Sequence, residues 1–308
     1  MPDLELHSRG PYSLAASTAF LEGFTPAAYT PRDDALRLAF VTDDAFVPGG
    51  AERVAGVILR AEGDRVVGEI AGDADPAVVR RQVERILSLD VDGSGFLAVG
   101  ERDPVVGRLQ ARYPGLRPVL FLSPYEAAAW ALIGNRIRIT QAAKIKAEMA
   151  RQLGTAVEIG GNVEHAFPAP SRLARLDAFP GLSGRKVDYL RALAAGAASG
   201  RLDAAALRAV SSEQALATLQ EFLGIGPFGA GLILLRGAGA PDEVPASEPR
   251  LARAIATAYG LASPPSPAAT EAIAERWRPY RTWVVLLLRT MLEEDTGEIA
   301  GRPPSRSP

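Results

Sequence analysis

Two kinds of hydrophobic pattern divide the chain near residue 100. Before that point, short runs rich in β-branched residues occur at 35–41, 53–60 and 65–71. Turn residues, including Gly-Gly at 49–50, separate them, and this arrangement is typical of an antiparallel sheet. Residues 76–89 then carry apolar side chains at helical spacing. The first hundred residues therefore predict a small α+β unit.

From about residue 104 onward, nearly every segment has the spacing of a helix. Ser123-Pro-Tyr-Glu126 has the sequence of a capping box with proline at the first helical position, so a long helix is expected to begin there. Residues 135–140 break the pattern and residues 141–153 resume it. Further helices are expected at about 170–176, 183–198, 203–208, 211–222, 229–236, 249–259, 268–276 and 279–293.

These patterns predict an α+β fold class with two domains and a tail. An N-terminal domain over 1–103 would hold the antiparallel sheet and its helices. An all-α core of two helical subdomains would cover 104–293. Residues 294–308, which end Arg-Pro-Pro-Ser-Arg-Ser-Pro, are predicted to be disordered.

The composition narrows the class of protein. The chain has 308 residues, enough for two or three packed units, and no cysteine, which excludes disulfides and thiolate metal sites. The N-terminus lacks the pattern of a signal peptide. The apolar run Trp283–Leu288 is far shorter than the roughly 20 residues that cross a bilayer. A cytoplasmic protein without a membrane partner is expected.

Charge is unevenly distributed along the chain. The net charge is −2, but residues 1–100 carry 9 basic against 16 acidic side chains, and the remainder carries 25 against 20. Because electrostatic fields act locally, the mildly basic C-terminal part can bind phosphate while the whole molecule stays acidic.

A glycine-rich hairpin at 222–230 has the features of a phosphate-binding turn. Gly224, Gly226 and Gly229 lie between two apolar helical runs. Glycines leave backbone N–H groups accessible, and such groups beside a helix N-terminus bind anions. A tight helix–helix turn without a ligand is the alternative. The carboxylate that follows at a fixed distance favours the functional interpretation.

That carboxylate is Glu248, about twenty residues further along. Pro249 favours an extended conformation at the residue before it and suits the first turn of a helix. Glu248 is therefore expected at the N-terminus of a helix that runs to about Tyr259, where the helix dipole favours the ionised form. The alternative is a carboxylate at a helix start with no chemical role.

Several stretches together resemble the helix–hairpin–helix DNA glycosylase superfamily and, within it, the bacterial DNA-3-methyladenine glycosylase II family. They extend to about residue 293, and the acidic α+β start is similar to the family's N-terminal domain. The stretches are Leu223-Gly-Ile-Gly-Pro-Phe-Gly-Ala230, Leu234-Leu-Arg-Gly237, Val244-Pro-Ala-Ser-Glu-Pro-Arg-Leu251, Ala131-Leu-Ile-Gly-Asn-Arg-Ile-Arg-Ile-Thr-Gln-Ala-Ala-Lys144, Phe179-Pro-Gly-Leu-Ser-Gly-Arg-Lys186 and Glu275-Arg-Trp-Arg-Pro-Tyr-Arg-Thr-Trp283.

The resemblance implies a monofunctional enzyme of base excision repair. It would flip an alkylated base, of the 3-methyladenine type, out of double-stranded DNA and hydrolyse its N-glycosidic bond. It would act as a monomer in the bacterial cytoplasm, associated with the nucleoid, and would require no cofactor. A structural Na⁺ or K⁺ on the hairpin, held by the backbone carbonyls of Gln220, Phe222 and Ile225, is also implied.

The resemblance also assigns roles to side chains. Glu248 would drive bond cleavage. Gly224, Gly226 and Gly229 would bind the DNA backbone, and Asn135 and Arg136 would fill the gap left by the flipped base. The base pocket would include Phe228, Leu232 and Arg289.

Departures from the family pattern keep alternatives open. The family has aspartate where this chain has Glu248, and an apolar wedge in its best-known members where this chain has Arg136. Two pocket positions that are aromatic in the family are Leu232 and Arg289 here. Pairing of Arg289 with Glu248, or a place outside the pocket, are the alternatives for this arginine. A non-catalytic relative that binds damaged DNA, or an enzyme with altered lesion preference, is therefore the second hypothesis. The bifunctional branch has a lysine where this chain has Phe228, so lyase chemistry by that route is not expected.

Overall fold

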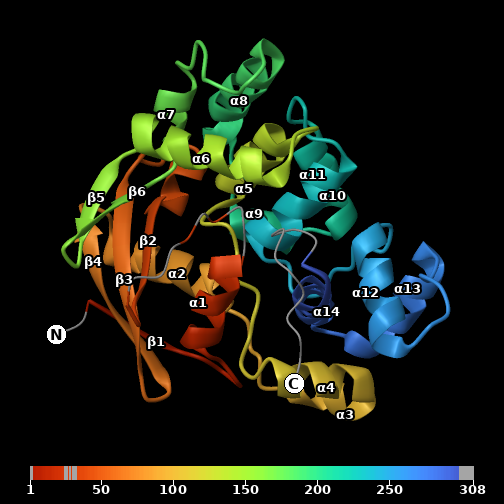
Figure 1. Ribbon diagram of the computed structural model, residues 1–308. Helices are drawn as coiled ribbons and strands as arrows, with labels where there is room; N and C mark the ends of the chain where they lie inside the picture. The colour runs from red at the N-terminus through yellow and green to blue at the C-terminus, as the bar shows by residue number, and fades with distance from the viewer. Residues whose placement is uncertain (1–2, 24–26, 28, 30–32, 298–308) are drawn as a thin grey trace.

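The fold is given by a computed structural model that describes residues 3–23, 27, 29 and 33–297. It consists of an antiparallel sheet with helices on one side and a larger helical part beside it (Figure 1). The expected α+β fold class is confirmed. Within the described ranges, no helix is both long and apolar enough to span a membrane.

The N-terminal sheet is antiparallel throughout, with strand order β1-β4-β3-β2. Its register pairs Leu38 with Val57 and Leu59 with Gly68. The three predicted strands are present, whereas β1, which has only four residues, gave no recognisable pattern. The strands are β1 (Leu4–His7), β2 (Leu36–Val41), β3 (Val54–Glu62) and β4 (Arg65–Gly72).

Both faces of this sheet are covered. Helices α1 (Leu14–Gly23) and α2 (Pro76–Ile86) pack on one face, and a small hairpin packs on the other. Every residue of β2 is buried as a result. The hairpin consists of β5 (Ala156–Ile159) and β6 (Asn162–His165), in a region predicted to be helical or irregular. With four residues each, these strands are too short for alternation to identify them.

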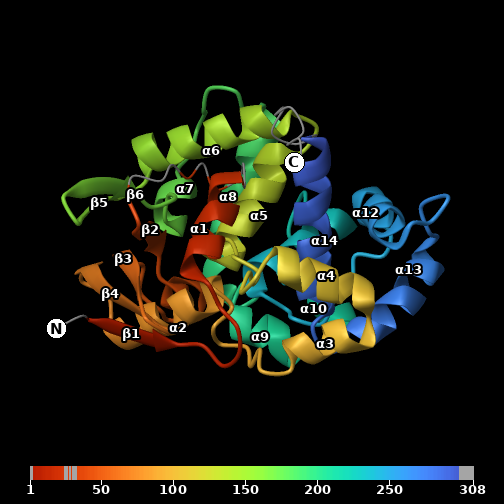
Figure 2. The ribbon, with the colours of Figure 1, turned by 60° about the horizontal axis from the view of Figure 1, so that its bottom comes forward.

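The remaining elements form the helical part, which Figure 2 shows from a second direction. The α-helices are α3 (Phe96–Arg102), α4 (Pro104–Arg112), α5 (Pro124–Gly134), α6 (Ile139–Leu153), α7 (Pro170–Leu173), α8 (Gly184–Gly196), α9 (Ala204–Ala209), α10 (Ser212–Gln220), α11 (Pro227–Leu232), α12 (Pro249–Tyr259), α13 (Pro267–Ala274) and α14 (Arg281–Thr296). Short 3₁₀ helices among the described residues include η2 (Asp43–Phe46), η3 (Ala197–Ser199) and η5 (Glu275–Trp277), and η4 (Ile233–Ala238) is a π-helix.

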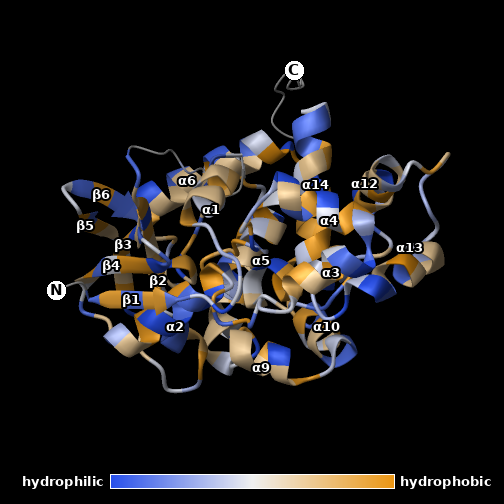
Figure 3. Ribbon diagram, turned by 90° about the horizontal axis from the view of Figure 1, so that it is seen from below, coloured by the Kyte–Doolittle hydropathy of each residue, from blue (hydrophilic) through white to orange (hydrophobic). Residues whose placement is uncertain are grey.

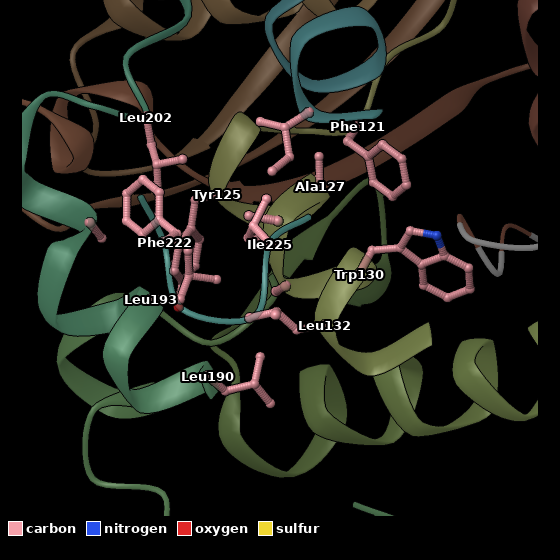
Figure 4. Close-up of a cluster of buried hydrophobic side chains, with 14 of the residues drawn as sticks. Phe121, Tyr125, Ala127, Trp130, Leu132, Leu190, Leu193, Leu202, Phe222 and Ile225 are labelled. Carbon is pink, nitrogen blue, oxygen red and sulfur yellow. The ribbon is translucent and has the colours of Figure 1, made fainter. Parts of the chain in front are cut away.

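Helix α5 is the centre of the main hydrophobic core. Nearly all of its side chains are buried, including those of Tyr125, Trp130 and Leu132, because neighbours surround it. It packs against α6, α8, α11 and η4. In Figure 4, Tyr125 and Leu132 lie among side chains of α8 and of the hairpin before α11, whereas Trp130 points away from them.

The start of α5 differs in one detail from the prediction. The Ser123 hydroxyl caps the helix by accepting a hydrogen bond from the Glu126 amide (3.1 Å). The Glu126 carboxylate does not complete a capping box, because it forms a buried ion pair with Lys146 of α6 (2.6 Å). The helix start is therefore as predicted, but a tertiary contact replaces the local one.

A second core lies around Trp277 and Trp283, between α3, α4, α12 and α14. Figure 3 shows hydrophobic residues concentrated along α14 and in the strands of the sheet. We propose that the N-terminal domain ends at residue 103, although α3 and α4, on either side of this boundary, pack together.

The last helix extends into the predicted tail. Helix α14 continues to Thr296, and Arg112 of α4 pairs with Glu294 (2.8 Å) and Asp295 (2.9 Å). These ion pairs give residues 294–296 a helical structure that composition alone did not indicate. Residues 298–308 of the predicted tail lie outside the described residues.

One buried arginine joins the sheet domain to the helical part. Arg85 of α2 binds both carboxylate oxygens of Asp43 (3.0 and 3.1 Å) and donates to the carbonyl of Gly237 in η4 (2.7 Å). It also donates to the carbonyl of Leu122, just before α5 (2.8 Å). Arg85 thus connects α2 to η4 and to the segment just before α5.

Arg85→Met is expected to lower the free energy of unfolding by about 3 kcal/mol, because it leaves the Asp43 carboxylate without its partner. Urea denaturation followed by circular dichroism measures this change. Arg81→Met is the matched control, since Arg81 lies on the same helix and is exposed. Equal effects of the two substitutions would contradict a tie between the domains.

Candidate functional site

The hairpin connects α10 to α11, and its three glycines are there for different reasons. Gly224 has φ +87°, and a Cβ there would lie 2.4 Å from the ring of Tyr189, so only glycine fits. Gly226 precedes α11 and has open space around it. Gly229 is buried, and a Cβ there would meet Ile225 at an ordinary 3.4 Å.

The backbone of the hairpin leaves donors available. The Ile225 amide donates to the Phe222 carbonyl (3.0 Å), and both side chains anchor the turn in the core. Other amides find no acceptor within the described ranges, namely those of Gly224, Gly226, Phe228 and Gly229. Such donors at the start of a helix match the arrangement predicted for an anion.

The carbonyls implied as cation ligands lie in the same turn. That of Phe222 accepts from the Ile225 amide, while those of Gln220 and Ile225 accept from no group in the described part of the chain. Carbonyl oxygens with free lone pairs suit a monovalent cation, so the residues present fit such an ion. The described residues contain no cluster of three or more His, Asp or Glu side chains that could hold a metal.

The loop after α5 contains the two predicted gap-filling residues. Asn135 ends the helix, and Arg136 has φ +57°, a left-handed conformation that non-glycine residues seldom adopt. Both side chains are exposed. Among the described residues, Arg136 has no hydrogen-bonding or ion-pair partner. The loop therefore presents a free guanidinium on a strained backbone.

Glu248 occupies the position that the sequence predicts. It has the extended conformation expected before Pro249 (φ −80°, ψ 118°), and α12 runs from Pro249 to Tyr259. Its side chain is 12% exposed and does not cap its own helix. The carboxylate therefore lies near the positive end of α12 and is turned to another partner.

That partner is Arg289 of α14. Its Nη1 lies 3.0 Å from each carboxylate oxygen of Glu248. Arg289 is 38% exposed, so the pair is open on the guanidinium side. Pairing with Glu248 is one of the alternatives that the sequence left open for Arg289, and the structure shows this pair.

A second arginine lies behind this pair. Burial, together with the charge of Arg289, lowers the pKa of Arg236 to about 9. Arg236 belongs to η4 and donates to the Val119 carbonyl (2.8 Å). The guanidinium groups of Arg236 and Arg289 thus lie close enough for their like charges to repel.

The other two predicted pocket residues lie on α11. Phe228 is 74% exposed at the first turn, and Leu232 is half-buried against the main core at its end. Sequence reasoning gave no role to Lys186 or Tyr189 of α8, which contact the loops around this site. The sequence gave a partial indication for Lys186, because this residue ends one of the stretches that resemble the family.

The chain is similar in sequence to two curated DNA-3-methyladenine glycosylases. The chain is 24% identical over 216 residues to a DNA-3-methyladenine glycosylase of Bacillus subtilis, covering 69% of this chain and 71% of that protein. It is 31% identical over 185 residues to DNA-3-methyladenine glycosylase 2 of Escherichia coli, covering 59% of this chain and 62% of that protein. No family model matches the chain.

Among solved structures, a 3-methyladenine DNA glycosylase from Archaeoglobus fulgidus superimposes with a TM-score of 0.77 at 22% identity. The alignment covers 94% of this chain and 98% of that one, so the two share a fold over nearly their whole length. The fold and the hairpin define a helix–hairpin–helix protein. In sequence and in fold, the chain is similar to DNA glycosylases of the helix–hairpin–helix superfamily.

Gly224→Ala is expected to lower the free energy of unfolding by at least about 1–2 kcal/mol, because the left-handed backbone disfavours any Cβ and Tyr189 blocks its place. Gly229→Ala is the matched control: it adds the same methyl group to the same hairpin without a close contact. Thermal denaturation of the two variants distinguishes them. Equal melting temperatures would show that the turn does not depend on Gly224.

Proposed function

We propose that the protein is a monofunctional DNA glycosylase that removes alkylated bases, of the 3-methyladenine type, from double-stranded DNA. The observation that carries this proposal is the nearly buried Glu248 carboxylate at the N-terminus of α12, which follows the glycine hairpin in the chain. The names of the Bacillus subtilis and Escherichia coli relatives support the same activity.

Binding would begin at the hairpin. The free amides around Gly224 and Gly226 would hold a phosphate of the DNA backbone near the lesion. The damaged nucleotide would then leave the stack, which requires a few kcal/mol. Asn135 and Arg136 are exposed on the loop after α5, and they would fill the vacated position. The planar guanidinium of Arg136 can stack on bases as well as contact phosphate.

Cleavage would depend on Glu248. Breaking an N-glycosidic bond develops positive charge on the sugar, and a carboxylate held nearby stabilises that charge or orients the attacking water. The alkylated base leaves with the electron pair of the bond, and water supplies the new hydroxyl group on the sugar. Glutamate reaches further than the family's aspartate by one methylene, and the pairing with Arg289 fixes that longer side chain in one place.

Arg289 would also influence which lesions are accepted. A cationic base, such as 7-methylguanine, approaches a carboxylate whose charge is already paired by the guanidinium. Phe228 is exposed and offers an aromatic face that attracts such a base. The lesion preference would therefore reflect a balance between attraction by Phe228 and repulsion by Arg289.

Other features of the proposal follow from the family. The chemistry requires no cofactor, because water is the nucleophile. The carbonyls of Gln220, Phe222 and Ile225 would hold a Na⁺ or K⁺ ion, which would add positive charge next to the bound phosphate. We further infer that the enzyme acts as a monomer on chromosomal DNA in the bacterial cytoplasm, in association with the nucleoid.

Glu248→Gln is expected to reduce base excision by at least about 100-fold, because the amide keeps the shape but removes the negative charge. Binding to a duplex with a tetrahydrofuran abasic-site analogue should remain within about threefold of wild type, since the hairpin is untouched. Single-turnover release of free base from methylated duplex and fluorescence anisotropy measure the two quantities.

Glu248→Asp is the matched control, since it retains the charge and restores the family residue, and measurable excision should persist. Equal loss of excision and binding in Glu248→Gln would mean that the carboxylate is structural. Absence of excision by the wild-type protein, with binding to the abasic-site duplex intact, would support the non-catalytic alternative instead.

Arg289→Met is expected to raise the kcat/KM for 7-methylguanine relative to neutral hypoxanthine by about tenfold, because it removes a positive charge beside the cationic base. Arg250→Met removes an equal charge from α12 without touching Glu248, and should leave the ratio unchanged. If Arg289→Met lowers both rates in parallel, the arginine positions the carboxylate and does not select the lesion.

A further inference from the structure

Helix α8 contacts the loop that follows α5 through one lysine. The Nζ of Lys186 donates to the carbonyl of Ile133 (2.6 Å). This carbonyl lies in the last turn of α5 and lacks its usual helical donor, because the Ile137 amide turns to Gly134 instead (3.3 Å). A cation at a helix C-terminus is also favoured by the helix dipole. Lys186 thus fixes the end of α5 immediately before the loop of Asn135 and Arg136.

The same helix contacts the glycine hairpin one turn later. The ring of Tyr189 lies where a side chain of Gly224 would be, 2.4 Å from the ideal Cβ position. Leu132 of α5 closes the other side of that position at 2.9 Å. Because Lys186 and Tyr189 are three residues apart, they lie on one face of α8. Figure 4 shows α8 beside α5 and the hairpin, with Leu190, Leu193, Leu132 and Ile225 gathered between them.

We propose that Lys186 is a positioning residue for base flipping: it holds the gap-filling loop in register with the hairpin, to which Tyr189 ties the same helix. This inference rests on the proposed function. The gap left by a flipped base has a fixed place relative to the phosphate held by the hairpin. Misplacement by about 1 Å can reduce a rate by about 100-fold.

The loop needs such external support because its own backbone is strained. Arg136 has a left-handed conformation, which persists in a non-glycine residue only when the surroundings impose it. The side chain of Arg136 has no hydrogen bond or ion pair to a described residue, so it does not stabilise the loop itself. The hydrogen bond from Lys186 fixes a carbonyl in the last turn of α5, two residues before the loop begins.

The test compares Lys186→Met with Arg185→Met. Arg185 is the preceding residue, is exposed, and makes no hydrogen bond or ion pair within the described ranges, so its replacement removes the same charge but spares Ile133. Single-turnover excision of 7-methylguanine is measured in duplex and in single-stranded oligonucleotides. Only the duplex leaves a gap that must be filled.

Lys186→Met is expected to slow excision from duplex by about tenfold and from single strands by less than about twofold. Arg185→Met should change neither excision rate by more than about twofold. Its loss of positive charge should only weaken the affinity for DNA in a salt-dependent way. Lys186→Arg, which keeps a donor that can reach the carbonyl, should recover most of the duplex rate. Parallel loss on both substrates, or equal effects of the two methionine variants, would overturn the inference.

A second measurement separates this inference from the proposed function. Fluorescence of 2-aminopurine next to a tetrahydrofuran abasic-site analogue in duplex reports how the protein occupies the gap, with no excision step. Lys186→Met should reduce the fluorescence change at saturating protein by at least about half, and Arg185→Met should retain it. A wild-type protein that excises nothing would refute the proposed enzyme, while this comparison would still decide the role of Lys186. A fluorescence change in Lys186→Met equal to that of the wild type would overturn the positioning role of Lys186.

Discussion

The ion pair between Glu248 and Arg289 is the constraint on which the site depends. It joins α12 to α14 and gives a nearly buried carboxylate a charged partner, without which its burial would be costly. The same ion pair engages the Glu248 carboxylate, which the proposed reaction requires. The more exposed partner, Arg289, is the one that can move when a nucleotide enters. The pair would then hold the acid ready in the free protein and release it when the developing sugar cation competes for it.

The rest of the fold sets where this pair lies relative to the loops that we propose bind DNA. Helix α5 is buried on almost all sides and carries at its end the loop of Asn135 and Arg136. The hairpin packs against the same helix, and α8 contacts both. On the opposite side, Arg85 binds the backbone of η4, the element that carries Arg236. Rigid packing of these elements is what a reaction with ångström tolerances requires.

Much of this could be predicted from the sequence. Local signals sufficed for the capped helix at Ser123, for α12 after Pro249 and for the strands between 35 and 72, because turns, prolines and periodicity are local. The β5–β6 hairpin could not be predicted, since its stability comes from packing on the sheet. The contact of Lys186 with Ile133 joins residues distant in sequence, and no spacing rule reveals it. The pairing of Arg289 with Glu248 could be named only as one alternative, because spacing does not decide which distant residues meet.

The most direct test is a crystal structure with a duplex that carries a cationic cyclic-amine analogue of the sugar at the lesion. The central claim is that Glu248 faces the charge that develops on an extruded nucleotide. The account predicts that the Glu248 carboxylate lies within about 4 Å of the ring nitrogen and that Arg289 has turned away. An intact Glu248–Arg289 pair, with the ring nitrogen more than about 8 Å from the carboxylate, would contradict it.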